Sequence, residues 1–172
     1  MSARGEAASL QGAAMLNDKT RETIDHWVSK FPPEKKRSAL IQSLIAAQKQ
    51  NGGWITQELT EAVADYLELP RVWAHEVVSF YSMFFTSPVG RHKVHICTNI
   101  SCWLNGADDV VTHAEKKLGV ALGGTTEDGR ITLVKEEECL AGCCGAPMMI
   151  VDGHYHENLD LERLDAILDG LE

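Results

Sequence analysis

All five cysteines of the 172-residue chain lie between positions 97 and 144, so the first 96 residues contain none. Cysteines gathered in this way predict two regions with different roles, of which only the second carries thiol chemistry. Four of them form spaced pairs, Cys97 with Cys102 and Cys139 with Cys143, with four and three intervening residues respectively. We therefore expect one chemical site in the second region, built from two cysteine-bearing loops.

The first region is predicted to be helical. Apolar residues recur at helical spacing in four segments that are separated by Pro, Gly or Asn-Gly. The segments are 24–31, 33–50, 56–67 and 70–83. We expect residues 18–86 to form a helical bundle, preceded by a mobile tail over residues 1–17, where Ala, Gly and Ser follow no period. Ser87-Pro88-Val89-Gly90 is predicted to be a linker.

The second region, residues 91–172, alternates strands and helices. The pattern predicts strands near 94–97, 131–134, 148–151 and 155, and helices over 106–118 and 161–171. Asp152-Gly153 is typical of a tight hairpin. A strand, a helix and a second strand form a right-handed crossover with parallel strands, whose carboxyl ends lie at one edge of the sheet. Since Cys97 ends the first strand and Cys139 follows the second, the two cysteine loops are expected to face each other.

Four converging thiols suit either a tetrahedral zinc ion or an iron–sulfur cluster. Disulfides are disfavoured by the odd cysteine count and by N-terminal residues that lack the apolar core of a secretory signal, from which we expect a cytosolic, reducing location. Zinc sites use cysteines spaced by two to four residues, so zinc stays open. The gaps of four and three residues are wider than the two-residue gap that is commonest at zinc sites, and they favour a [2Fe–2S] cluster with one pair of thiolates on each iron. They do not match the plant-type ferredoxin spacing.

Charge and hydropathy exclude other classes of function. The formal net charge of −9 would repel a nucleic-acid backbone. The longest apolar stretch, near residues 77–85, is far shorter than the roughly 20 residues that cross a bilayer, so no membrane insertion is expected. The chain has no G-x-G-x-x-G motif and should not bind NAD by itself.

Residues beside the cysteines are expected to shape the site. They are three glycines that allow close backbone approach, an acidic run that would lower a cluster's potential or simply be solvated, a histidine on the strand face of Cys97 and a tryptophan that shields the site or packs on the next helix. These residues are Gly106, Gly142, Gly145, Glu136–Glu138, His95 and Trp103. The apolar stripe ending at Phe84 and Phe85 is expected to be mainly bundle core, with one of these two rings able to meet a partner.

Four runs of sequence together resemble one known family. They are residues 31–54, residues 77–90, the run CTNISC at 97–102 and the run ECLAGCCGAPMM at 138–149. In this order they are similar to the thioredoxin-like ferredoxin subunit, known as the E subunit, of respiratory NADH:quinone oxidoreductase, or complex I. The resemblance covers the chain from about residue 20 to its last residue.

This resemblance implies an α+β fold, in which a helical bundle precedes a thioredoxin-like ferredoxin domain over residues 91–172. It implies one [2Fe–2S] cluster held by Cys97, Cys102, Cys139 and Cys143, and no catalytic residue. It further implies that NADH and FMN are bound by a partner flavoprotein subunit, whose flavin exchanges electrons with the cluster. Such a chain is an enzyme only as a subunit of the complex, beside other peripheral-arm subunits, in the cytoplasm and attached to the inner membrane through that arm.

Two alternatives and one departure accompany this interpretation. The equivalent subunits of NAD-reducing hydrogenases and NAD-dependent formate dehydrogenases look similar over the same motifs. A zinc-stabilised scaffold without a redox role would be a different class of protein. Cys144 departs from the family pattern. If the Cys143 side chain points into the loop, the next side chain of an extended backbone points away, so Cys144 is expected to be a spectator.

Overall fold

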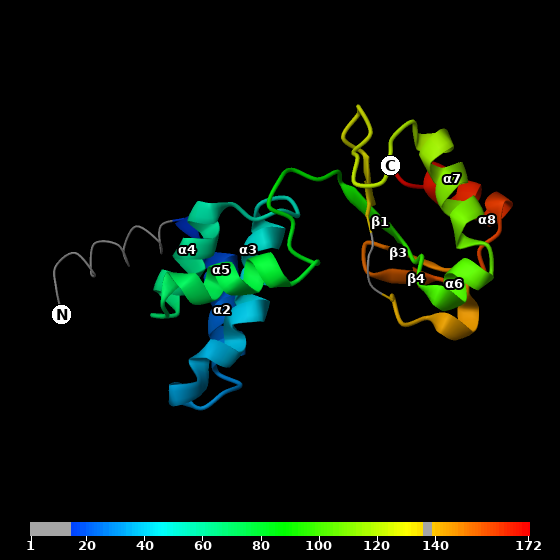
Figure 1. Cartoon of the computed structure of the whole chain (residues 1–172). Helices are drawn as coiled ribbons and strands as arrows, with labels where there is room; N and C mark the ends of the chain where they lie inside the picture. Colours follow the sequence, from blue (N-terminus) through cyan, green and yellow to red (C-terminus); the bar gives the residue numbers. More distant parts are fainter. Residues whose placement is uncertain (1–14, 136–138) are drawn as a thin grey trace. The chain divides into compact units, whose positions relative to one another are not determined.

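The computed structural model describes residues 15–135 and 139–172 (Figure 1). The chain divides into two compact units, Met1–Pro88 and Val89–Glu172. Most of the expected tail, residues 1–14, and the acidic run Glu136–Glu138 lie outside the described residues. The end of that tail, residues 15–17, belongs to the first unit, because Leu16 is 1% exposed and packs in its core. Within the described ranges, no helix is long and apolar enough to cross a membrane.

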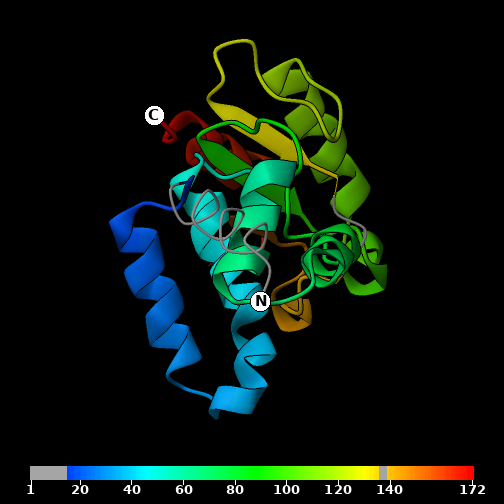
Figure 2. The same ribbon diagram turned by 90° about the vertical axis from the view of Figure 1, so that its left-hand side faces the viewer.

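Over residues 15–88, the first unit contains four α-helices and one 3₁₀ helix. They are α2 (Asp18–Val28), η1 (Pro33–Ala39), α3 (Leu40–Gln50), α4 (Gln57–Tyr66) and α5 (Arg71–Phe80). In Figure 2, α2 in blue and α3 in cyan form the two arms of a hairpin that η1 closes. The prediction that this part of the chain forms a helical bundle is therefore confirmed.

Local signals explain where these helices begin. The side chain of Asn17 accepts a hydrogen bond from the Thr20 N–H at 2.8 Å, and that of Thr56 accepts one from the Leu59 N–H at 3.1 Å. Each contact satisfies one of the N–H groups that the first turn of a helix leaves without a partner. Pro70 precedes α5, where its fixed φ suits the start of a helix.

Burial at helical spacing holds the bundle together. The buried side chains lie three or four residues apart on each helix, so that each helix turns one apolar face inward. The largest fully buried side chains of this core are Leu16, Ile24, Leu40, Leu44 and Ile55, of which Leu16 and Ile55 lie just outside the helices.

The second predicted segment is not one α-helix. Lys35 has φ −112° and ψ 18°, and residues 33–39 form a 3₁₀ helix before α3 begins. The fourth predicted helix, which is α5, ends at Phe80 rather than near residue 83, because Tyr81 is extended at φ −94° and ψ 122°. The predicted apolar stripe is divided as a result. Phe84 is 7% exposed and belongs to the core, whereas Phe80 is 78% exposed.

In the described part of the second unit, residues 89–135 and 139–172, a four-stranded mixed sheet is accompanied by three α-helices. The strands are β1 (His92–Ile96), β2 (Ile131–Val134), β3 (Met149–Val151) and β4 (His154–His156), in the order β2-β1-β3-β4. The helices are α6 (Ile100–Leu104), α7 (Ala107–Leu118) and α8 (Leu161–Asp169). Strands β1 and β2 are parallel, and the other neighbouring pairs are antiparallel. The predicted α+β fold class is confirmed.

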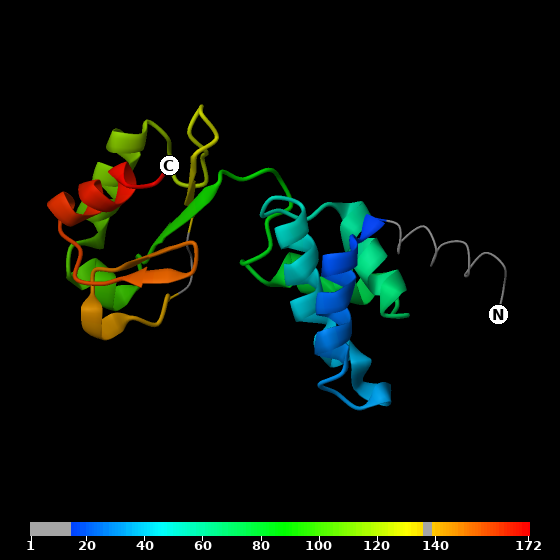
Figure 3. The ribbon, with the colours of Figure 1, turned by 180° about the vertical axis from the view of Figure 1, so that it is seen from behind.

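One face of this sheet carries the core of the second unit. Side chains at alternate positions of β1, β2 and β3 point to the same face, as the two-residue period of a strand requires. Helices α7 and α8 lie next to each other over that face, as Figures 1 and 3 show from opposite sides. The buried residues that they share with the sheet include Val94, Ile96, Ala114, Leu133, Leu164 and Leu168.

The predicted hairpin joins β3 to β4. Asp152 and Gly153 both have left-handed backbone, at φ 50° and 87°, which is the geometry of a two-residue type I′ turn. The Asp152 carboxylate also accepts the Lys93 N–H at 2.9 Å and lies 2.6 Å from Nδ1 of His92. The hairpin is thereby tied to β1.

The sequence predicts one helix between the first two strands, but the structure has two. The extra helix, α6, has five residues, which is too short for a helical period to be visible. Gly106 separates α6 from α7 with φ 87°, a left-handed conformation that favours glycine. The extra helix matters for the site because it carries Cys102.

Candidate metal centre

The two cysteine loops meet at one edge of the sheet. Cys97 directly follows β1, and Cys102 lies on α6. Cys139 follows β2 after a short connection, and Cys143 opens the 3₁₀ turn η2 (Cys143–Gly145). Because β1 and β2 are parallel, both loops leave the sheet from the same edge. The Sγ atoms of Cys139 and Cys143 are 3.6 Å apart.

The four thiols differ in burial. Cys97 is 2% exposed and Cys102 is 1% exposed, and both pack with Ala107 and Met148 in a small apolar cluster. The Cys97 N–H donates to the Met148 carbonyl oxygen at 3.1 Å, which anchors the end of β1. Cys139 and Cys143 are exposed. The site thus has an inner pair of thiols and an outer pair at the surface.

Burial and neighbouring groups shift the pKa values of the thiols. The pKa of Cys102 is raised to about 11, first by burial and then by the thiol of Cys97, while a backbone hydrogen bond with Met148 acts in the opposite direction. The pKa of Cys143 is raised, first by its hydrogen bond with Cys139, although the Ser101 hydroxyl opposes this. Removal of a thiol from water disfavours its charged form, as the shift at Cys102 shows.

Cys139 behaves in the opposite way. Its pKa is lowered first by the Ala141 N–H, which donates to Sγ at 3.4 Å, and then by hydrogen bonds with Cys143 and Cys97. Hydrogen bonds to a thiolate stabilise the charged form. The four thiols therefore act on one another as a group. The contacts from Ala141 and Ser101 were not anticipated from the sequence, where neither residue type carries a signal for this role.

The donor set can be compared with the groups that four cysteines bind. Within residues 15–135 and 139–172, no three His, Cys, Asp or Glu side chains are arranged around a single metal ion. The thiols are spaced as two pairs on two loops. A [2Fe–2S] cluster takes four cysteine thiolates, and these four sulfur donors fit that requirement.

Cys144 directly follows Cys143 in the same turn. It is the second residue of η2 and is exposed. Among the contacts described for the other four thiols, none involves Cys144.

Each of the three glycines also has a reason within the protein itself. A Cβ atom on Gly142 would lie 2.9 Å from Cε of Met148, and one on Gly145 would lie 2.4 Å from Cβ of Glu157. These glycines make room for neighbouring protein side chains. Around Gly106 there is open space, and its role is the left-handed turn before α7.

Trp103 and His95 lie close to the site in the fold. The Trp103 side chain is 52% exposed, and its indole N–H donates to Asp108 in the first turn of α7 at 2.8 Å. This contact holds the Trp103 side chain, which belongs to α6, against α7. Packing on the next helix is one of the two roles expected for Trp103. His95 lies within β1, where it is aligned with Val134 and Ile150 of the neighbouring strands.

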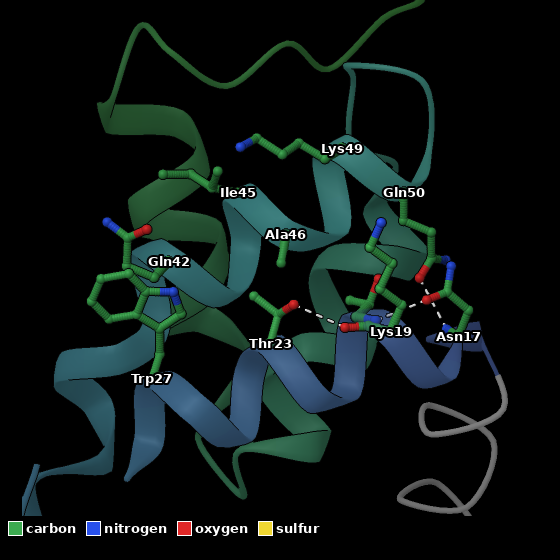
Figure 4. A pocket seen from close by; sticks show the side chains of 10 residues that line it. Asn17, Lys19, Thr23, Trp27, Gln42, Ile45, Ala46, Lys49 and Gln50 are labelled. Carbon is green, nitrogen blue, oxygen red and sulfur yellow. Dashed lines mark hydrogen bonds between the residues drawn. The ribbon is translucent and has the colours of Figure 1, made fainter. Parts of the chain in front are cut away.

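A separate groove of about 530 Å³ lies between α2 and α3 in the first unit (Figure 4). Its lining contains Trp27, Ile45 and two lysines, but no cysteine, histidine or carboxylate. Several of its polar groups bond to one another or to the backbone: the Asn17 N–H donates to Gln50 and the Thr23 hydroxyl donates to the Lys19 carbonyl. The thiol site, rather than this groove, is the candidate for chemistry.

Comparison with known proteins defines the class. Residues 24–172 match the family of thioredoxin-like [2Fe-2S] ferredoxins. The chain therefore belongs to this family. The match spans the helical unit from within α2 as well as the whole sheet unit.

Individual relatives narrow the class further. The E subunit of NADH-quinone oxidoreductase from Rickettsia felis is 44% identical over 142 residues, which is 83% of this chain and 84% of the relative. The E subunit designated 2 of the same enzyme from Rhizobium meliloti is 42% identical over 87% of this chain and 86% of its own length. The mitochondrial NADH dehydrogenase [ubiquinone] flavoprotein 2 of Dictyostelium discoideum is 36% identical over 87% of this chain and 60% of its own length.

Solved structures agree on the fold. An NAD⁺-reducing [NiFe]-hydrogenase in the air-oxidized state matches 74% of this chain with a TM-score of 0.62 and 23% identity. The match covers 22% of that hydrogenase chain.

Proposed function

We propose that this chain is the electron-transferring E subunit of an NADH-quinone oxidoreductase and holds one [2Fe–2S] cluster. Cys97, Cys102, Cys139 and Cys143 would be its ligands, within a ferredoxin domain of residues 91–172 that follows a bundle of residues 18–86. The observation that carries this proposal is the meeting of two cysteine loops at the edge of the sheet where β1 and β2 both end. Relatives of more than 40% identity that bear this subunit's name support it.

When bound, the cluster supplies a site that gains and loses one electron at a time. The chain's own residues then have separable roles. Cys97 and Cys102 hold the inner side of the site, where burial with Met148 excludes water. Cys139 and Cys143 hold the outer side at the protein surface, where a redox partner can approach. The backbone N–H of Ala141 stabilises negative charge on Cys139.

The source of electrons in this proposal is a partner subunit. The sequence contains no dinucleotide-binding fingerprint, so NADH and FMN would be bound by a flavoprotein subunit, and the flavin would exchange electrons with the cluster of this chain. We propose that the complex lies in the cytoplasm, attached to the inner membrane through its peripheral arm with the other subunits of that arm.

The test is anaerobic purification of the whole chain, followed by iron and acid-labile sulfide assays and EPR spectroscopy. We expect about two irons and two sulfides per chain and a signal that develops on reduction. A Cys97→Ser variant should lose the signal, and Cys144→Ala serves as the matched control. Stoichiometric zinc without sulfide, after growth with ample iron, would instead favour a zinc-stabilised scaffold.

A second candidate is the equivalent subunit of an NAD-reducing hydrogenase or an NAD-dependent formate dehydrogenase. This second candidate is supported by the fold that the chain shares with an NAD⁺-reducing [NiFe]-hydrogenase. Gentle purification of the chain from its own cells, with mass spectrometry of the subunits that accompany it, separates the candidates. Recovery of quinone-oxidoreductase subunits supports the first proposal, and recovery of a hydrogenase or formate dehydrogenase subunit overturns it.

A further inference from the structure

The loop between the two outer thiols has an unusual backbone at its centre. Ala141 has φ 62°, in the left-handed region that residues with a side chain rarely adopt. The N–H of the same residue donates to Sγ of Cys139 at 3.4 Å. The N–H of Ala141 thus faces the sulfur two positions earlier, and the left-handed φ of Ala141 turns the following residues back, so that the Cys143 sulfur lies 3.6 Å from that of Cys139.

Side-chain packing does not explain this conformation. Ala141 is exposed. The following residue, Gly142, is held close to Met148, since a Cβ atom there would lie 2.9 Å from Cε of that methionine. The loop therefore keeps a strained backbone at an exposed position directly beside a sulfur atom. Strain of this kind is characteristic of sites where backbone geometry serves a function.

We infer that Ala141 is a positioning residue: its N–H donates to the Cys139 sulfur, its left-handed φ lets the chain continue from that contact back to Cys143, and the hydrogen bond raises the reduction potential of the bound cluster. This inference rests on the proposed function. Hydrogen bonds to the sulfurs are one of the factors that set the potential of an iron–sulfur cluster. A donor N–H withdraws negative charge from the sulfur, and it therefore stabilises the reduced cluster, which carries one more electron, more than the oxidised cluster.

Three substitutions at position 141 separate backbone conformation from side-chain effects. Val is β-branched and strongly disfavours a left-handed backbone, whereas Asn and Gly tolerate it. In Ala141→Val we expect the midpoint potential to fall and iron to leave the protein about fivefold faster in the presence of a chelator. In Ala141→Asn and Ala141→Gly we expect the potential of the unsubstituted protein. Because the side chain is exposed, none of the three should meet a buried neighbour.

A second measurement removes the donor itself. Replacing Ala141 by the corresponding α-hydroxy acid exchanges the amide N–H for an ester oxygen and leaves the side chain unchanged. We expect the ester protein to keep its cluster with a lower midpoint potential. This measurement decides the matter if the Ala141→Val variant does not fold.

The outcomes are distinguished by the potential, together with the iron and sulfide content of the unsubstituted protein. An unchanged potential in the ester protein, or an equal fall in Ala141→Val and Ala141→Asn, would overturn the inference. If the unsubstituted protein held no iron or sulfide, the proposed function itself would have failed. The two failures are therefore distinguishable.

Discussion

A single methyl group added at Gly145 tests how the cysteine-bearing turn is held. The added Cβ would lie 2.4 Å from Cβ of Glu157 and 2.7 Å from its Cγ and Cδ. Carbon atoms attract best at roughly 3.5–4.0 Å, so the two segments would have to separate by about 1 Å. They are joined by a hydrogen bond from the Asn158 N–H to the Gly145 carbonyl oxygen at 2.6 Å, which resists that movement.

The expected cost follows from these contacts. Overpacking at a well-packed position costs about 1–3 kcal/mol, and weakening one backbone hydrogen bond adds about 1 kcal/mol. We therefore expect Gly145→Ala to lower the free energy of unfolding by roughly 2–4 kcal/mol. The assay is urea unfolding of the anaerobically purified protein, followed by circular dichroism for the fold and by visible absorbance for the proposed cluster.

Truncation of Glu157 provides a sharp control. The nearest atom is Cβ, which Glu157→Ala keeps and Glu157→Gly removes. The double variant with Glu157→Gly should recover most of the lost stability, and the one with Glu157→Ala only part of it. Equal recovery in both, or a loss below about 0.5 kcal/mol in Gly145→Ala alone, would refute the argument from the Cβ contact.

Three further predictions concern other parts of the second unit. Cys144→Ala should keep the iron content and EPR signal, whereas Cys143→Ala should lose the cluster or leave it labile; the reverse pattern would exchange their roles. Leu164→Ala, at a fully buried position of α8, should cost about 2–5 kcal/mol in urea unfolding, and a cost below about 1 kcal/mol would contradict the assigned core. The pKa of His92 is raised by its hydrogen bonds with Asp152 and a backbone carbonyl. Burial would raise the pKa of Asp152, but the Lys93 N–H and His92 together lower it. The histidine's contribution is complete below about pH 6.5 and fades as pH rises through its raised pKa, and the carboxylate's is complete above about pH 4 and fades as pH falls. The pair's contribution to the free energy of unfolding, about 0.5–1 kcal/mol, should therefore be greatest between these two pH values. When unfolding is measured across pH, the stability of the unsubstituted protein should decline above about pH 6.5, and the His92→Gln variant should not show this decline.

Much of the fold could be predicted because its signals are local. Thr56 caps α4 through a contact only three residues away, and Asp152-Gly153 forms a hairpin through its own backbone angles. The parallel arrangement of β1 and β2 also follows from local order, since a crossover connection leaves few alternatives. The two cysteine loops could thus be assigned to one edge of the sheet from the order of the elements alone.

Other features depend on contacts between residues far apart in the chain. The burial of Cys97 and Cys102 beside Met148, while Cys139 and Cys143 stay exposed, results from how the loops pack on the sheet. The sequence does not distinguish these pairs, because a cysteine has the same side chain in either place. Helix α6 escaped prediction because five residues are too few to display a period.

The sequence by itself determined the class of chemistry, because four thiols in two spaced pairs can serve only a few purposes, and it determined the elements that carry them. The tertiary structure decided the burial and the hydrogen-bond partners of each thiol. Gly145 is required because Glu157, twelve residues later, occupies the space of a side chain. The hydrogen bond from Ala141 to Cys139 depends on how the loop between Cys139 and Cys143 folds, which the cysteine spacing does not reveal. Composition and periodicity record which groups are present, whereas the free energies of close approach and burial depend on distances that only the folded chain defines.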